Sequence, residues 1–142
     1  MKGEKVRTAN FLEKMADVLE VDSIGIDDEF RQVPEWCSLK AFGLMVTLEN
    51  DYGAKVGVDE FLKLRTVRDL YRVAFAAFAA ELLGVPRETI DGESAMGTVP
   101  AWDSVMHLRM VMEGEKKFGC AYPLEIVPSL RKISDFVEKA VW

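Results

Sequence analysis

The sequence is poor in cysteine and histidine, with two cysteines and one histidine among its 142 residues. Cys37 and Cys120 are widely separated, so they form neither a disulfide framework nor the paired spacing of a metal site. The histidine, His107, follows Ser104 by three residues, but no third group is apparent that would orient it as a catalytic base. The sequence therefore argues against a disulfide scaffold, a bound metal and a serine or thiol enzyme.

The sequence also lacks long apolar runs and basic clusters. Its longest apolar run, residues 73–80, is far shorter than the ~20 residues that cross a bilayer. Residues 1–10 are polar and charged, which is not the pattern of a signal peptide. The net charge of −6 divides evenly, with −3 in residues 1–72 and −3 in residues 73–142, so nucleic acid is not an expected partner. We expect a cytoplasmic protein whose acidic surface suits partners rich in Lys and Arg.

The chain does contain an internal repeat. Several blocks match in the same order at an offset of 66, which indicates a duplication. They pair residues 33–39 with 99–105, residues 49–53 with 115–119, and residues 64–70 with 130–136. Further upstream, Ile26-Asp27 pairs with Ile90-Asp91 at an offset of 64, which implies a two-residue difference in the intervening loop.

Both repeats follow one helical plan. In the first repeat, a first helix ends near Val21, a second runs from Ser38 to Gly53, and a closing helix begins near Thr66. In the second repeat, the corresponding positions are Gly84, Ser104 to Gly119, and Lys132. Glycine suits the left-handed conformation that ends a helix. Apolar residues in steps of three and four predict the second helix: Leu39, Phe42, Met45, Leu48 and Tyr52, and then Val105, Leu108, Val111 and Phe118. No alternating strand pattern is present, so the fold class is all-α.

The junction between the repeats has no linker composition. Residues 67–83 contain no Pro, Gly or Ser and are rich in Ala. This favours one continuous helix of roughly 25 Å joining the repeats, and the alternative is two helices with a kink within residues 74–77. The expected domains are residues 1–73 and residues 74–142.

The motif Val99-Pro100-Ala101-Trp102-Asp103-Ser104-Val105, followed by a helix and Phe118-Gly119, resembles the acyl carrier protein family. In that family an Asp-Ser-Leu-type triplet begins the second helix and often follows a Trp. The resemblance also covers residues 82–85, Ile90 and residues 130–136, which is nearly the whole second repeat. It implies two acyl-carrier-protein-like helical bundles in tandem.

The resemblance further implies a function. A phosphopantetheinyl transferase would move 4'-phosphopantetheine from coenzyme A onto the Ser104 hydroxyl, and Asp103 would help to hold the transferase's metal ion. The arm's thiol would carry an acyl or aminoacyl group as a thioester to acyl-loading and acyl-using enzymes. Such a protein is not itself an enzyme. Whether the cargo is fatty acyl, β-hydroxyacyl, aminoacyl or polyketide stays open, as does the oligomeric state.

The position of Ser104 suits this chemistry. A helix N-terminus stabilises the phosphodiester anion, and before modification the Ser104 hydroxyl can cap the helix. Trp102 is expected to pack the preceding loop onto the bundle, and His107 is interpreted as a surface residue near a docking site. Alternatively, Asp103 and Ser104 are only capping residues.

The first repeat departs from the motif. Cys37 stands where the acid would be, next to Ser38, so Ser38 is a weaker attachment candidate and the first repeat is expected to be silent. Cys37 is either a structural, buried cysteine or a reactive thiol at a helix N-terminus. The second repeat's second helix is less acidic than is usual in the family, which suggests a specialised pathway. The alternative function is an interaction module that has lost the arm on both serines.

Overall fold

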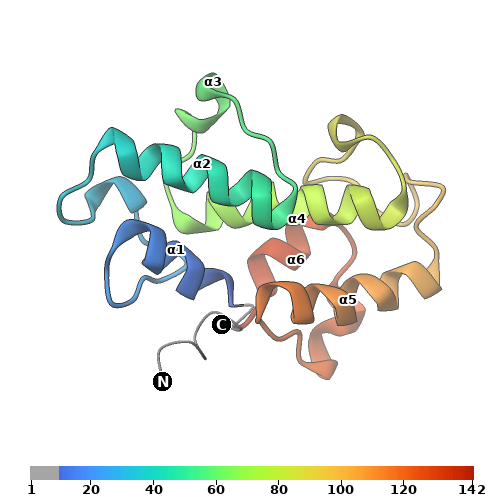
Figure 1. Ribbon diagram of the computed structural model, residues 1–142. Coiled ribbons are helices and arrows are strands. Elements are labelled where there is room, and N and C mark those ends of the chain that lie inside the picture. Colours follow the sequence, from blue (N-terminus) through green and yellow to red (C-terminus); the bar gives the residue numbers. More distant parts are fainter. Residues whose placement is uncertain (1–9) are drawn as a thin grey trace.

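The computed structural model describes residues 10–142, and the signal-peptide expectation concerns residues outside this range except for Asn10. The described part is helical, without a strand, and the all-α prediction is confirmed (Figure 1). The α-helices are α1 (Phe11–Leu19), α2 (Ser38–Tyr52), α3 (Val58–Phe61), α4 (Val67–Leu83), α5 (Ser104–Phe118) and α6 (Ile133–Lys139). Short 3-10 helices are η2 (Phe30–Gln32), η3 (Arg87–Thr89) and η4 (Leu124–Ser129). Within residues 10–142, no helix has the length and apolarity to traverse a membrane.

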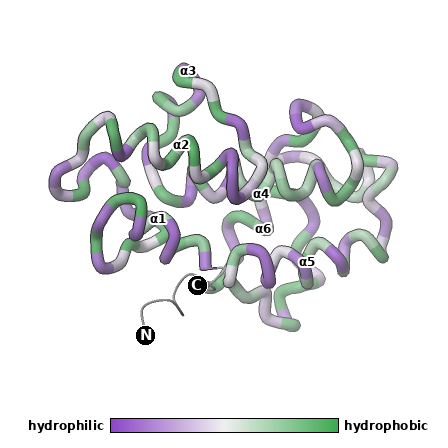
Figure 2. Tube along the Cα trace, viewed as in Figure 1, coloured by the Kyte–Doolittle hydropathy of each residue, from purple (hydrophilic) through white to green (hydrophobic). Residues whose placement is uncertain are grey.

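Helix α4 is the central element of the fold. It runs unbroken over 17 residues, so the prediction of a continuous helix between the repeats is confirmed. Thr66 and Asp69 close a capping box at its start, and Gly84 ends it with a φ of 70°. The expected domain boundary between residues 73 and 74 lies inside α4, which has buried side chains on both sides of it. Figure 2 shows the largely hydrophobic colouring of its second half. The division into two domains stays a prediction.

The repeat in the sequence has a counterpart in the hydrogen bonds, which recur at residues 66 apart. Asp69 Oδ2 accepts from the amides of residues 65 and 66, as Asp135 Oδ2 does from those of residues 131 and 132. Two backbone hydrogen bonds recur in the same way. The amide of Val67 donates to Asp28 O, as the amide of Ile133 donates to Ser94 O, and the amide of Arg68 donates to Ile26 O, as the amide of Ser134 donates to Gly92 O. The bridge between Glu29 and Thr66 likewise recurs between Ala95 and Lys132. Both halves therefore connect the long loop to the closing helix in the same way.

These bonds correct one part of the sequence alignment. The amide of Gly25 donates to the Asp28 side chain, and the amide of Asp91 donates to the Ser94 side chain. These two bonds are equivalent, and both their donors and their acceptors lie 66 residues apart, so the offset of 66 already holds at Gly25 and Asp91. The pairing of Ile26-Asp27 with Ile90-Asp91 was wrong, because the buried Ile90 matches the buried Ile24. The offset of 64 holds only at the preceding helix ends, where Glu20 and Gly84 adopt the left-handed conformation. The two extra residues therefore lie in the turn around η3.

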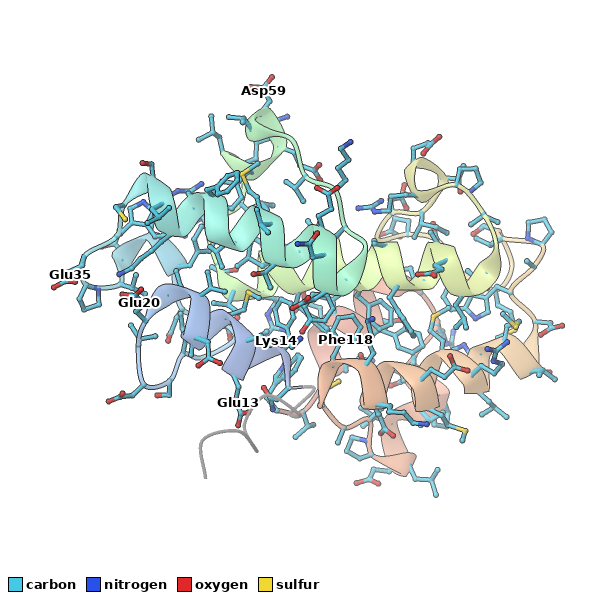
Figure 3. The ribbon with its side chains drawn as sticks, in the orientation of Figure 1. Glu13, Lys14, Glu20, Glu35, Asp59 and Phe118 are labelled. Atoms are coloured by element: carbon cyan, nitrogen blue, oxygen red, sulfur yellow. The ribbon has the colours of Figure 1, made fainter. Side chains whose placement is uncertain are left out.

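One hydrophobic core joins the two halves. At its centre Tyr52 and Phe118, the last residues of α2 and α5, stack with ring centroids 5.2 Å apart and an interplanar angle of 11°. Phe11 and Tyr71 pack against the Phe118 ring at 6.0 and 5.0 Å. Figure 3 places Phe118 at the middle of the molecule and Glu35, which precedes α2, at its left edge. The first residues of α2 and α5 therefore lie at opposite ends (Figure 1).

Candidate functional site

Helix α5 begins at Ser104, as the sequence predicts. Asp103 is its N-cap in an extended conformation, and Asp103 Oδ1 accepts a hydrogen bond of 2.9 Å from the amide of Met106. The expectation that the Ser104 hydroxyl caps the helix is wrong, because Asp103 occupies the capping position. Ser104 is exposed, and its hydroxyl makes no hydrogen bond to another residue of the described range. The hydroxyl is therefore accessible to an incoming reagent.

The backbone around Ser104 suits an anion. The first amides of a helix have no intrahelical acceptor, and here Asp103 takes only that of Met106. Within residues 10–142, the amides of Ser104 and Val105 have no acceptor. Helix α5 is 15 residues long, so its N-terminus carries the positive end of a full macrodipole. A phosphate ester on Ser104 would lie where these amides and the dipole stabilise it.

Trp102 and His107 form a buried pair next to this helix start. The Trp102 side chain is 1% exposed, and its Nε1–H donates a hydrogen bond of 3.1 Å to His107 Nδ1. The prediction that Trp102 packs the loop onto the bundle is confirmed. The interpretation of His107 as a surface residue was wrong, because it is 9% exposed and its ring meets that of Phe136 edge-on at 5.5 Å. The signal was present in the sequence: His107, Met110, Gly114 and Phe118 follow steps of three and four, and all four are buried.

The hydrogen bond also fixes the tautomer of His107. A tryptophan indole can only donate, so His107 Nδ1 is unprotonated and a neutral ring carries its proton on Nε2. Burial lowers the pKa of His107, which favours this neutral form. His107 is therefore a hydrogen-bond donor through Nε2 and an acceptor through Nδ1.

A pocket of about 450 Å³ lies beside His107. The loop before α5 and the segment from η4 towards α6 form its walls. Its lining is mostly apolar and consists of Ala95, Met96, Gly97, His107, Val127, Pro128, Leu130 and Arg131. His107 and Arg131 contribute the charged or strongly polar side chains of this lining.

The helices that follow the two serines carry exposed apolar side chains at matching positions. On α5 these are Val105, Leu108 and Met112, and Leu124 of η4 is exposed as well. Their counterparts on α2 and α3 are Leu39, Phe42, Val46 and Val58, which are also exposed. The apolar periodicity predicted the helices correctly, but only its second part, including Leu48 and Tyr52, faces the core. The helix that begins at each serine therefore carries exposed apolar side chains in its first turns.

The site in the first half has a different chemistry. Ser38 begins α2, but its N-cap residue is Cys37, whose side chain makes no capping hydrogen bond. Cys37 is exposed, so the expectation of a buried structural cysteine was wrong for this residue. The structure does not bring Ser38 and Ser104 together, since the two helix starts lie at opposite ends of the molecule (Figure 1). The acid that accompanies Ser104 has no counterpart at Ser38.

Within residues 10–142, no cluster of three or more His, Cys, Asp or Glu side chains could hold a metal ion. Comparison of the chain with protein-family models, curated proteins and solved structures finds no match.

Proposed function

We propose that this chain is an acyl or aminoacyl carrier protein with its 4'-phosphopantetheine arm on Ser104. The observation that carries the proposal is the start of α5, where an exposed serine follows an acid that caps the helix. It is supported by the family resemblance of the surrounding sequence and by hydrogen bonds that repeat in the two halves. We further propose two carrier-like bundles that share α4.

The attachment step requires a transferase and coenzyme A. The Ser104 hydroxyl loses its proton, its Oγ forms a bond to phosphorus, and the pyrophosphate P–O bond of coenzyme A breaks as the adenosine bisphosphate leaves. When attached, the arm supplies a thiol that holds the cargo as a thioester. The free amides of Ser104 and Val105 stabilise the resulting phosphodiester. Because its second oxygen is not needed for the cap, Asp103 can also face the transferase's metal ion.

The partner enzymes would dock beside the arm. The exposed side chains of Val105, Leu108 and Met112 offer them apolar contact area. Nearby, Arg109 and Glu113 pair with each other at 2.8 Å, so this surface is not strongly acidic. A mixed charge favours the partners of a specialised pathway.

The second candidate function is an interaction module without an arm. It is favoured for the first half, where Ser38 has no acidic neighbour but Leu39, Phe42 and Val46 are exposed. This half could bind a partner through its apolar surface alone.

Intact mass distinguishes the two functions. The purified chain is incubated with coenzyme A and a broad-specificity transferase, beside the variants Ser104→Ala and Ser38→Ala. We expect one added arm in the wild type and in Ser38→Ala, and none in Ser104→Ala. If no arm is added with several transferases, the interaction module is the better description.

A further inference from the structure

Both halves place a tryptophan two residues before their serine, but only the second tryptophan has a histidine partner. Trp36 and Trp102 occupy matching positions, 66 residues apart, and the residue that matches His107 is Ala41. Trp36 is half-buried, and within residues 10–142 its indole makes no hydrogen bond to another residue. Trp102 is buried and donates to His107 Nδ1. The pair therefore occurs only in the half that has an acid beside its serine.

The hydrogen bonds of His107 connect the two residues before Ser104 to the first turns of α5. The His107 ring accepts the Trp102 indole N–H at 3.1 Å, and the His107 amide donates to the Asp103 carbonyl at 2.9 Å. The Asp103 side chain accepts from the amide of Met106. Three hydrogen bonds therefore hold residues 102 and 103 against residues 106 and 107.

The start of α2 has fewer of these bonds. Of the three, only the bond from the Ala41 amide to the Cys37 carbonyl recurs among the described residues, at 3.1 Å. The preceding turn differs as well, because the Trp102 amide donates to Val99 O and no such bond from the Trp36 amide is found within residues 10–142. The additional restraints are therefore concentrated at the serine that follows the acid.

Helix α6 supports the pair of Trp102 and His107. The His107 ring meets that of Phe136 at 5.5 Å between centroids, and the Trp102 ring lies 6.3 Å from the same ring. Phe136 is fully buried, and its carbonyl accepts a hydrogen bond from the Tyr122 hydroxyl. Packing and hydrogen bonds of this kind lock side chains in single rotamers, which the precise placement of reacting groups requires.

We propose that His107 is a positioning residue for arm attachment: by accepting the Trp102 indole N–H, it holds Asp103 and Ser104 in the arrangement that the transferase must meet. This inference rests on the proposed function. In the transfer step, Ser104 Oγ gives up its proton and bonds to phosphorus while adenosine bisphosphate leaves coenzyme A. Such a step needs the reacting atoms in near contact, and a misplacement of about 1 Å can slow it about a hundredfold. His107 acts on this step only through Trp102 and Asp103.

The kinetics of arm transfer separate positioning from docking and from stability. Initial rates are measured over a range of chain concentrations with coenzyme A and a broad-specificity transferase, at a temperature where circular dichroism shows each variant to be folded. His107→Leu removes the acceptor, and we expect kcat to fall about ten- to hundredfold while KM changes by less than about threefold. Leu108→Ala, on the exposed surface proposed for docking, should instead raise KM.

Two further variants assign the effect to the hydrogen bond. His107→Asn places an amide oxygen near the position of Nδ1, so it can accept from Trp102 and should keep kcat within about threefold of wild type. Trp102→Phe removes the donor and should lower kcat as His107→Leu does. The double variant should lose no more than the larger single loss, because both changes remove the same interaction.

The outcomes separate this inference from the proposed function. If no arm is added to wild type, the carrier proposal fails and the positioning role fails with it. If wild type accepts the arm but His107→Leu has an unchanged kcat, or if His107→Asn is as slow as His107→Leu, only the positioning role is overturned. Additive losses in the double variant would also overturn it. If His107→Leu does not fold, Trp102→Phe replaces it, and an unchanged kcat in that variant would reject the role.

Discussion

At the scale of single residues, the pair of Trp102 and His107 connects stability with the candidate site. Each supplies the hydrogen-bond partner that the other needs in a buried position, because an unpaired buried polar group is costly. The sequence predicted the burial of Trp102 from its place in the motif. The burial of His107 was missed although His107 shares the helical spacing of Met110 and Phe118, because histidine as a residue type is common both on surfaces and in protein interiors.

Trp102→Ala should lower the free energy of unfolding by roughly 3–5 kcal/mol, because it removes a large buried ring. Trp102→Phe is the matched control: it keeps an aromatic ring but leaves His107 Nδ1 without a donor, and it should cost about 1–2 kcal/mol. Urea denaturation followed by circular dichroism measures both. A loss below about 1 kcal/mol for Trp102→Ala is incompatible with a buried ring.

The stability of the protein should fall as the pH decreases from 7.5 to 5.5. Burial lowers the pKa of His107, so below the unfolded pKa of about 6.5 the unfolded chain binds more protons at this residue than the folded chain does. The stability that the neutral His107 ring contributes is fully present above a pH of about 6.5 and is lost as the pH falls through the lowered pKa of the folded state. Urea melts of wild type and His107→Gln across this range isolate the effect, and parallel pH profiles of the two proteins would contradict it.

At the scale of elements, helix ends were the features that the sequence predicted best. The starts of α2 and α5 at Ser38 and Ser104 and their ends at Gly53 and Gly119 are found as expected. These ends depend on local chemistry, since glycine adopts a positive φ without strain. The face that each helix buries depends on its neighbours, and this is why the exposure of Leu39 and Phe42 could not be derived from periodicity alone.

Gly119→Ala should destabilise the protein more than Gly53→Ala. Both glycines have a positive φ, 71° and 67°, so either alanine meets a backbone penalty of about 1–2 kcal/mol. At Gly119 the new Cβ would also lie 2.6 Å from Asn10 Cα, whereas at Gly53 it meets open space. Chemical denaturation of both variants gives the difference. Equal losses would mean that α1 does not start against the end of α5.

At the scale of the whole molecule, the two halves share one hydrophobic core. Phe75, near the middle of α4, contacts Tyr71 at 5.8 Å, Phe118 at 5.8 Å and Phe136 at 5.2 Å between ring centroids. The repeat and the continuous α4 were predictable from the sequence. The stacking of Tyr52 on Phe118 was not, because matching blocks reveal a duplication without revealing how its copies pack.

Phe75→Ala should destabilise both halves together, by about 3–5 kcal/mol. We expect a single unfolding transition that coincides when followed by helical circular dichroism and by tryptophan fluorescence, in wild type and variant alike. An exposed substitution on the same helix, Glu81→Gln, serves as the control and should change stability by less than about 0.5 kcal/mol. Two separate transitions in the variant would show that the halves unfold independently.

The central claim is that Ser104, and not Ser38, carries the arm, and peptide mapping by mass spectrometry tests it most directly. After incubation with coenzyme A and a transferase, trypsin releases Ser38 in the peptide of residues 32–40 and Ser104 in that of residues 88–109. The account predicts the mass of the arm on the peptide 88–109, with fragments that place it on Ser104, and an unmodified peptide 32–40. An arm found only on residues 32–40, or on neither peptide, would contradict it.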